Sequence, residues 1–188
     1  MPYCGKLEFY YGNMSEFWRF LDIIYPDNNL YRNGCPKLED INKFLAHNKF
    51  SITDIVMHTH VDRFSTDKDM GAISNEDLNT CLKKWLKESQ IETIYFTSFG
   101  GTNSARSLFK KWYKKEFGKV RKISKEHKCS IVMFERNINL IDLFSPSPTA
   151  RKNASRIKEF IGWREKTKTK NDYDTFRIEW YREHLPKL

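Results

Sequence analysis

The sequence predicts an α/β protein: a single three-layer domain over residues 1–188, with a central, largely parallel sheet flanked by helices. Short segments rich in β-branched and aromatic residues alternate with longer segments whose apolar residues recur at helical spacing. This alternation is typical of a parallel sheet covered by helices on both faces. A chain of 188 residues with 39% apolar residues is also long enough to bury one core.

The chain contains segments with the short apolar pattern of strands and segments with the apolar spacing of helices. Strands are expected at residues 50–57, 91–98, 129–135 and 138–144. Helices are expected at residues 14–25, 37–48, 75–89, from 105 onward, 153–165 and 173–185. The first helix is preceded by Asn13 and carries Glu16, which is the spacing of a capping box.

Positive charge is concentrated in two parts of the chain. The formal net charge is +9, whereas residues 106–128 carry ten Lys or Arg against two Glu, and residues 145–170 carry eight against two. The remaining residues together carry a net negative charge. Basic residues confined in this way indicate a surface for a polyanion such as DNA, over Arg106–Lys128 and Ser145–Lys170. A solvated helix face is the alternative that charge alone leaves open.

The cysteines and the hydropathy of the chain indicate a cytoplasmic protein. Cys4, Cys35, Cys81 and Cys129 are scattered without a Cys-x-x-Cys pair, so we expect free thiols in a reducing compartment and no metal site. No apolar run is as long as a membrane span, and the first residues lack the apolar stretch of a signal peptide. We expect a monomer that needs no cofactor and does not contact membranes.

Three loops leave the carboxyl ends of the expected strands, where α/β sheets bind their ligands. They follow Val56, Thr97 and Phe144. The second loop, TSFGGTNS, places two glycines before a helix N-terminus whose N–H groups can bind phosphate, and it makes Ser98 and Asn103 candidates for DNA binding. A tight strand-to-helix turn is the alternative.

The third loop, FSPSPTARKNA at residues 144–154, combines prolines, hydroxyl groups and positive charge. Pro146 and Pro148 fix the backbone, so neighbouring hydroxyl and N–H groups can hold phosphates at a small entropic cost. The expected DNA-binding residues of this loop are Ser145, Ser147, Thr149, Arg151 and Lys152. The alternative is a stiff turn in which Thr149 or Asn153 caps the next helix.

This loop resembles the second motif of the uracil-DNA glycosylase superfamily, which reads like Ser-Pro-Ser-Pro or His-Pro-Ser-Pro before small and polar residues. Other segments are similar to segments of divergent bacterial branches and occur in the same order: FYYGNMSEFWRFLDIIY, ITDIV, YFTSFGGTNSARSLFKK and TFRIEWYRE. The resemblance extends from about Phe9 to Tyr181. The family's Gly-x-x-Pro-like first motif is reduced here, since only MPYCGKLE precedes FYYGN.

The resemblance implies a DNA glycosylase, which flips a base out of DNA and hydrolyses its N-glycosidic bond. The oxocarbenium-like sugar needs a negative or dipolar group and an oriented water nearby, for which Glu16 and Asn13 are the candidates. Tyr10 or Tyr11 would stack on the flipped base. The alternatives are a helix cap for Asn13 and Glu16 and core packing for one of the tyrosines. No lysine stands in a motif as a nucleophile, so we expect a monofunctional enzyme.

Asp54, a further catalytic and base-binding candidate, takes the position at which relatives read the base. An ionised carboxylate only accepts hydrogen bonds, so it suits a base edge that carries donors. We therefore expect a modified cytosine, of the hydroxymethylated or glucosylated kind found in phage DNA, as the substrate in anti-phage defence, ahead of hypoxanthine or uracil. His58 is a candidate for hydrogen bonding to the base. A buried, turn-capping Asp54 and a catalytically silent DNA-binding relative are the alternatives.

Overall fold

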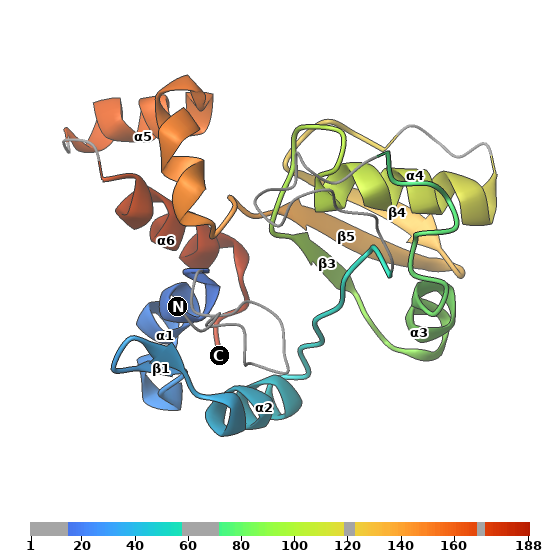
Figure 1. The fold of residues 1–188 in the computed structure, drawn as a ribbon, viewed down its shortest axis with the longest axis horizontal. Helices are drawn as coiled ribbons and strands as arrows, with labels where there is room; N and C mark the ends of the chain where they lie inside the picture. The colour runs from blue at the N-terminus through green and yellow to red at the C-terminus, as the bar shows by residue number, and fades with distance from the viewer. Residues whose placement is uncertain (1–14, 58–71, 119–122, 169–171) are drawn as a thin grey trace. The chain divides into compact units, whose positions relative to one another are not determined.

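The computed structural model describes residues 15–57, 72–118, 123–168 and 172–188 (Figure 1). Helices and a small mixed sheet occur together in these residues, so the predicted α/β class is confirmed. The chain divides into two compact units. Residues 1–53 with 144–188 form one, called here the helical unit, and residues 54–143 form the other, called the sheet unit. None of the helices in the described ranges is both long and apolar enough to cross a membrane.

The helical unit is built around the packing of its first helix on its last. Its elements are α1 (Phe17–Ile24), the 3-10 helix η1 (Pro26–Asn28), the hairpin of β1 (Tyr31–Arg32) and β2 (Cys35–Pro36), α2 (Leu38–His47), the 3-10 helix η2 (Pro148–Arg156), α5 (Lys158–Thr167) and α6 (Tyr173–His184). α1 packs on α6, where Phe20 and Tyr181, both fully buried, meet edge to face with ring centroids 5.7 Å apart. This contact joins segments from the two ends of the chain.

The sheet unit packs one long helix on a three-stranded sheet. Its elements are α3 (Leu82–Glu88), β3 (Thr93–Phe96), α4 (Ala105–Phe117), β4 (Lys128–Met133) and β5 (Arg136–Asp142), with strand order β3-β5-β4. Leu108, Phe109, Trp112 and Tyr113 of α4 belong to the same apolar cluster as Ile138 and Leu140 of β5. Leu82 and Leu86 of α3, with Leu78 from the segment before it, complete this core.

The predicted, largely parallel sheet is mixed in the described residues. β3 pairs with β5 in parallel, but β4 pairs with β5 in antiparallel fashion. Only Phe134 and Glu135 connect β4 to β5, with φ of 50° and 62°. Two residues with positive φ close a hairpin, whereas a parallel neighbour requires a crossover of about a dozen residues or more. The short connection therefore dictates the antiparallel pair.

Residues 50–57, which were expected to be a strand, do not join the sheet. Val56 forms an isolated antiparallel bridge with Leu78, and the N–H of Asn79 donates to Ile55 O at 2.9 Å. The segment before α3 thus forms hydrogen bonds with backbone groups of residues 50–57 that would otherwise pair with a strand of the sheet. Ile55 and Val56 still pack against the core of the sheet unit, which explains their apolar pattern.

Two predicted helices differ from the observed ones in extent. Residues 75–89 form only the shorter α3, since Asn79 Oδ1 accepts a hydrogen bond from the N–H of Cys81 at 3.0 Å, as in a turn. Residues 153–165 are divided between η2 and α5. Ile157, in extended conformation, separates the two.

Candidate functional site

Four successive carbonyl oxygens at the Ser-Pro-Ser-Pro turn are bound by other parts of the helical unit. The four successive acceptors are the carbonyls of Phe144, Ser145, Pro146 and Ser147. Tyr181 Oη donates to Phe144 O at 2.9 Å. Arg177 Nη1 donates to Ser145 O at 2.5 Å and to Ser147 O at 3.1 Å. The N–H of Glu16 donates to Pro146 O at 3.0 Å. The turn is therefore fixed from one side, by α6 and by the residue before α1.

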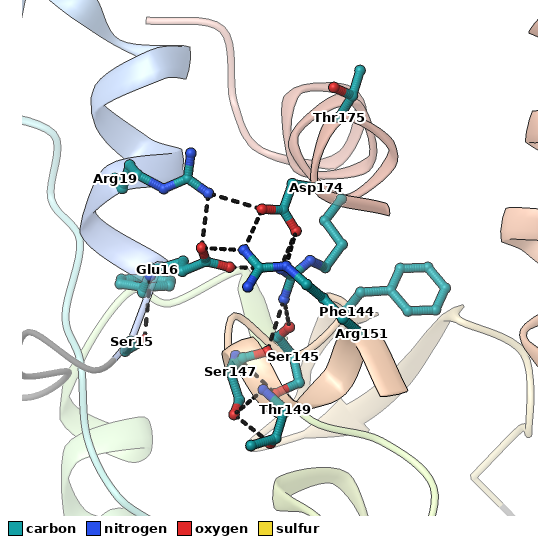
Figure 2. A network of polar contacts seen from close by, with 12 residues as sticks. Ser15, Glu16, Arg19, Phe144, Ser145, Ser147, Thr149, Arg151, Asp174 and Thr175 are labelled. Carbon is teal, nitrogen blue, oxygen red and sulfur yellow. Dashed lines mark hydrogen bonds and ion pairs between the residues drawn. The ribbon is translucent and has the colours of Figure 1, made fainter. Parts of the chain in front are cut away.

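Two carboxylates and three arginines form a closed set of ion pairs beside this turn, called here the ion cluster (Figure 2). Glu16 and Asp174 each pair with Arg19, Arg151 and Arg177. Arg177 Nη2 lies 2.6 Å from an oxygen of each carboxylate, and Arg19 Nη2 lies 2.9 Å from Glu16 Oε1 and 3.1 Å from Asp174 Oδ2. Arg151 Nη2 lies 2.5 Å from Glu16 Oε1 and also binds Asp174 Oδ2.

The centre of the ion cluster is the side chain of Arg177, which is 0% exposed. Its guanidinium lies over the rings of Phe20 and Tyr173, 4.8 Å and 4.9 Å from their centroids. A cation buried to this degree is tolerated only when opposite charges and acceptors surround it. Glu16 and Asp174 supply the charges, and the turn supplies two further acceptors.

The electrostatics of the ion cluster favour an ionised Asp174, and the cluster carries an excess of positive charge. Burial raises the pKa of Asp174, but the hydrogen bonds and charges of Arg151 and Arg177 outweigh it and hold that pKa at about 2. Three guanidinium groups against two carboxylates leave the cluster with a net positive charge. The most exposed member is Arg151, at 45% of its side-chain surface.

The hydroxyl groups of the turn bind N–H groups of the turn itself. Ser145 Oγ accepts from the N–H of Ser147 at 3.3 Å. Ser147 Oγ accepts from the N–H of Thr149 at 3.3 Å and lies 2.8 Å from Thr149 Oγ1. Ser147 is therefore the N-cap of η2, in place of Thr149 or Asn153. Pro148 occupies the first helical position, where its missing N–H costs nothing.

The surface that follows the turn is basic. Arg151, Lys152 and Arg156 of η2 and Lys158 of α5 are all exposed. Within the described ranges, Lys152, Arg156 and Lys158 form no ion pair, in contrast to Arg151. This part of the predicted basic surface is therefore available to a polyanion.

A pocket of about 360 Å³ lies beside η2 within the helical unit. Phe160 and Tyr173 supply its aromatic lining, and its charged groups include Arg151, Arg164 and Asp174. Asp172 also lines it, so acidic and basic groups balance and charge alone selects no ligand.

The TSFGGTNS loop of the sheet unit forms a tight strand-to-helix turn. Ser98 binds the start of α4 twice: its Oγ accepts from the N–H of Ala105 at 2.9 Å and its carbonyl accepts from the N–H of Arg106 at 3.2 Å. Ser104 is the N-cap of α4, and the two glycines adopt φ of 79° and 85°. Asn103 is half-buried. Phosphate binding by Ser98 and Asn103 stays a prediction.

Arg106, the first residue of the predicted basic segment 106–128, is buried rather than on the surface. Its side chain is 4% exposed, and Nη1 donates to Asp142 Oδ1 at 2.7 Å. Helical spacing explains this, because Arg106 shares the inward face of α4 with Phe109 and Tyr113. It ties α4 to the end of β5 and cannot contribute to a DNA-binding surface.

Asp54 is exposed, in contrast to the buried position of its predicted alternative. The backbone carbonyl oxygen of Asp54 accepts a hydrogen bond from the side-chain Nδ2 of Asn79 at 2.8 Å. Neighbouring protein atoms still remove part of the solvent, and this partial burial raises the pKa of Asp54. Asp54 belongs to the sheet unit and Glu16 to the helical unit.

The remaining candidates are Tyr10, Tyr11, Asn13 and His58, and they lie outside the described residues. The capping box expected for Glu16 is corrected, because α1 begins at Phe17 and Glu16 occupies its N-cap position. Its side chain makes no capping hydrogen bond and binds arginines instead.

Arg19, Asp174 and Arg177 were not among the predicted site residues. For Arg177 the sequence holds a signal, since Tyr173, Arg177 and Tyr181 recur at i, i+4 and i+8 and so share one helical face. A single arginine within such an apolar stripe must find buried carboxylates. Asp174 lies three residues before Arg177 on the same helix, whereas Glu16 reaches Arg177 only through the packing of α1 against α6, which no local pattern reveals.

Comparison of the chain with protein-family models, with curated proteins and with solved structures found no match.

Proposed function

We propose that the chain is a DNA glycosylase with a three-layer fold of the uracil-DNA-glycosylase kind, which flips a base out of DNA and hydrolyses its N-glycosidic bond. The observation that carries this proposal is the Ser-Pro-Ser-Pro turn. The four carbonyls from Phe144 to Ser147 are bound by α6 and Glu16, and the turn leads directly into exposed Arg151 and Lys152. The resemblance of this turn to the second motif of the superfamily supports the same function.

A turn with this construction suits the binding of DNA phosphates. Because its backbone is already fixed, it loses little conformational entropy when a ligand binds. Ser145, Ser147 and Thr149 offer hydroxyl groups, and the cations of η2 offer charge, which are the usual contacts of proteins to the DNA backbone. In the proposed complex, the start of η2 enters the minor groove and fills the space that the flipped base leaves.

The proposed reaction is hydrolysis at C1′ of the sugar. The oxygen of a water molecule bonds to C1′, the bond from C1′ to the base nitrogen breaks, and the base leaves with the electron pair and takes up a proton. Asn13 is the candidate for orienting the water. Glu16 is the candidate for offsetting the charge of the sugar, although three arginines share its oxygens.

A catalytically silent DNA-binding protein is the second candidate function. The observation that favours it is the same set of contacts to Glu16, because a carboxylate that already balances three guanidinium groups has little charge left to offer a sugar cation.

The substrate that we propose is a modified cytosine, of the hydroxymethylated or glucosylated kind, in a defence against phage. The proposal rests on Asp54, whose exposed carboxylate accepts hydrogen bonds from an amino group when ionised. Hypoxanthine and uracil are the alternatives.

One experiment tests both functions. The protein is incubated with duplex and single-stranded DNA carrying uracil, hypoxanthine, hydroxymethylcytosine or glucosylated hydroxymethylcytosine, and abasic sites are revealed by alkaline cleavage. Base release identifies a glycosylase, and a covalent adduct trapped by borohydride would contradict a monofunctional one. Binding without an abasic product on any DNA supports the silent protein, and the absence of both binding and release contradicts both candidates.

A further inference from the structure

One side chain, that of Arg177, connects the Ser-Pro-Ser-Pro turn with the ion cluster. We propose that Arg177 is a positioning residue that sets the conformation of the turn for binding DNA phosphates, and that Glu16 and Asp174 act on the turn through it. The identity of the ligand rests on the proposed function. The ordering of the turn by Arg177 does not.

The two terminal nitrogens of Arg177 have different partners. Nη1 donates to the carbonyls of Ser145 and Ser147, at 2.5 Å and 3.1 Å, and so spans the proline between them. Nη2 donates to Glu16 Oε2 and Asp174 Oδ1, each at 2.6 Å. The guanidinium therefore fixes the turn at one end and is itself fixed by the carboxylates at the other.

This arrangement requires a guanidinium group. Its donors lie in a rigid planar fork, which can serve acceptors on two sides at once. The compact ammonium of a lysine keeps the charge, but it has three donors around one atom for the four acceptors that Arg177 serves. An Arg177→Lys variant therefore keeps the charge balance and loses the geometry.

Glu16 reaches the turn by two routes. Its N–H donates to Pro146 O at 3.0 Å, and its carboxylate holds Arg177, which binds the carbonyls on either side of that proline. Glu16 thus acts on the turn through hydrogen bonds and ion pairs that need no substrate. This is a positioning role, distinct from contact with the reacting atoms.

The test measures the order of the turn without DNA, by NMR hydrogen exchange of the full chain. The N–H groups of Thr149 and Ala150 report it, because they donate to Ser147 Oγ and Ser147 O. In Arg177→Lys we expect both to exchange about tenfold faster or more, while amides of α2 keep their protection. Arg182→Met, an exposed arginine on the same helix, is the matched control and leaves all of them unchanged.

DNA binding and turnover are then measured on the same variants. For Arg177→Lys we expect the Kd for DNA to rise about tenfold, with kcat at saturating DNA within a few-fold of the parent protein. Tyr181→Phe, which removes the hydrogen bond from Tyr181 Oη to Phe144 O, shows the same changes to a smaller degree and serves if Arg177→Lys does not fold.

The outcomes separate this inference from the proposed function. Unchanged exchange at Thr149 and Ala150 in a folded Arg177→Lys protein overturns the positioning role. So does an unchanged Kd for DNA in a variant whose turn exchanges faster. If the parent protein binds no DNA while the Arg177→Lys turn loses protection, the proposed function fails and the ordering of the turn by Arg177 stands.

Discussion

Arg177 Nη2 and Glu16 Oε2 lie 2.6 Å apart, although the two residues are 161 positions apart in the chain. The contact joins α6 to the residue before α1, and it places the buried charge of Arg177 beside the Ser-Pro-Ser-Pro turn. Stability and the proposed binding of DNA therefore depend on the same side chains. Each substitution in the ion cluster must therefore be tested for its effect on stability and for its effect on DNA binding.

Glu16→Gln removes one of the two negative charges that surround Arg177. We expect the free energy of unfolding to fall by about 1–3 kcal/mol, because a buried cation loses a charged partner while the amide keeps the size of the side chain. If the role of Glu16 is positioning, KM for DNA rises about tenfold and kcat changes little. Urea unfolding and steady-state kinetics provide the two measurements.

The matched control for Glu16 is Glu39→Gln, which breaks an exposed pair with Lys43 on α2 and should change neither quantity measurably. A fall in kcat of about a hundredfold in Glu16→Gln, with KM unchanged, would instead identify Glu16 as a catalytic carboxylate.

The low pKa of Asp174 predicts a contribution to stability that disappears in acid. In the folded protein this pKa is about 2, below its usual value of 3.8, so the contribution is present above about pH 4 and is lost as pH falls towards 2. Asp174→Asn does not titrate. The difference in unfolding free energy between the parent protein and the variant should therefore shrink by about 1–2 kcal/mol from pH 5 to pH 2, after allowance for partial solvation.

Urea unfolding of the parent protein and of Asp174→Asn at each pH measures this difference. A gap between the two proteins that stays constant from pH 5 to pH 2 would show that Asp174 gains nothing from its arginines.

The basic surface of η2 predicts a salt-dependent affinity for DNA. Replacing both Arg151 and Lys152 by alanine should lower the affinity and reduce the slope of log Kd against log salt by about two, since each lost phosphate contact removes roughly one unit. Fluorescence anisotropy with a short duplex provides the measurement. Arg32→Ala with Lys43→Ala, which removes two exposed cations from the same unit, is the control.

Lys152→Ala alone isolates the DNA contact, because Arg151 also belongs to the ion cluster. An unchanged slope in the Arg151 and Lys152 double variant would place the DNA on another surface.

Local patterns predicted most helices because each element's apolar face lies within a few turns of sequence. α2 and α6 occur where the spacing of apolar residues places them, and α4 begins at Ala105, where a helix was expected. The sheet was less predictable, since strand direction depends on the length of the connection after Met133 rather than on the strand sequences. The segment around Val56 has a strand-like pattern but pairs locally.

The candidate site was predicted in part for the same reason. The Ser-Pro-Ser-Pro turn is a local motif, so its hydroxyl groups and the cations of η2 were identified from the sequence. Its partners Arg177 and Tyr181 are about thirty residues away and reach it only because α6 packs beside it. The role of Glu16 follows from charges that are distant in sequence, and a capping pattern could not reveal them.

The last prediction concerns the base that Asp54 would read. An ionised carboxylate cannot donate to O4 of uracil, whereas it accepts from the amino group of cytosine. We therefore expect poor activity on uracil, better activity on hypoxanthine, and the best activity on a modified cytosine, with ordinary cytosine refused through contacts to the modification. Because partial burial raises the pKa of Asp54, the preference should weaken as the pH falls and the carboxyl group gains a proton that it can donate. Asp54→Asn, which can both donate and accept, should lose activity on modified cytosine and gain activity on uracil, while Asp27→Asn, at an exposed site of the helical unit, changes neither. Rates of base release from matched duplexes are compared for the parent protein and the two variants. Efficient uracil excision by the parent protein would show that Asp54 does not read the base.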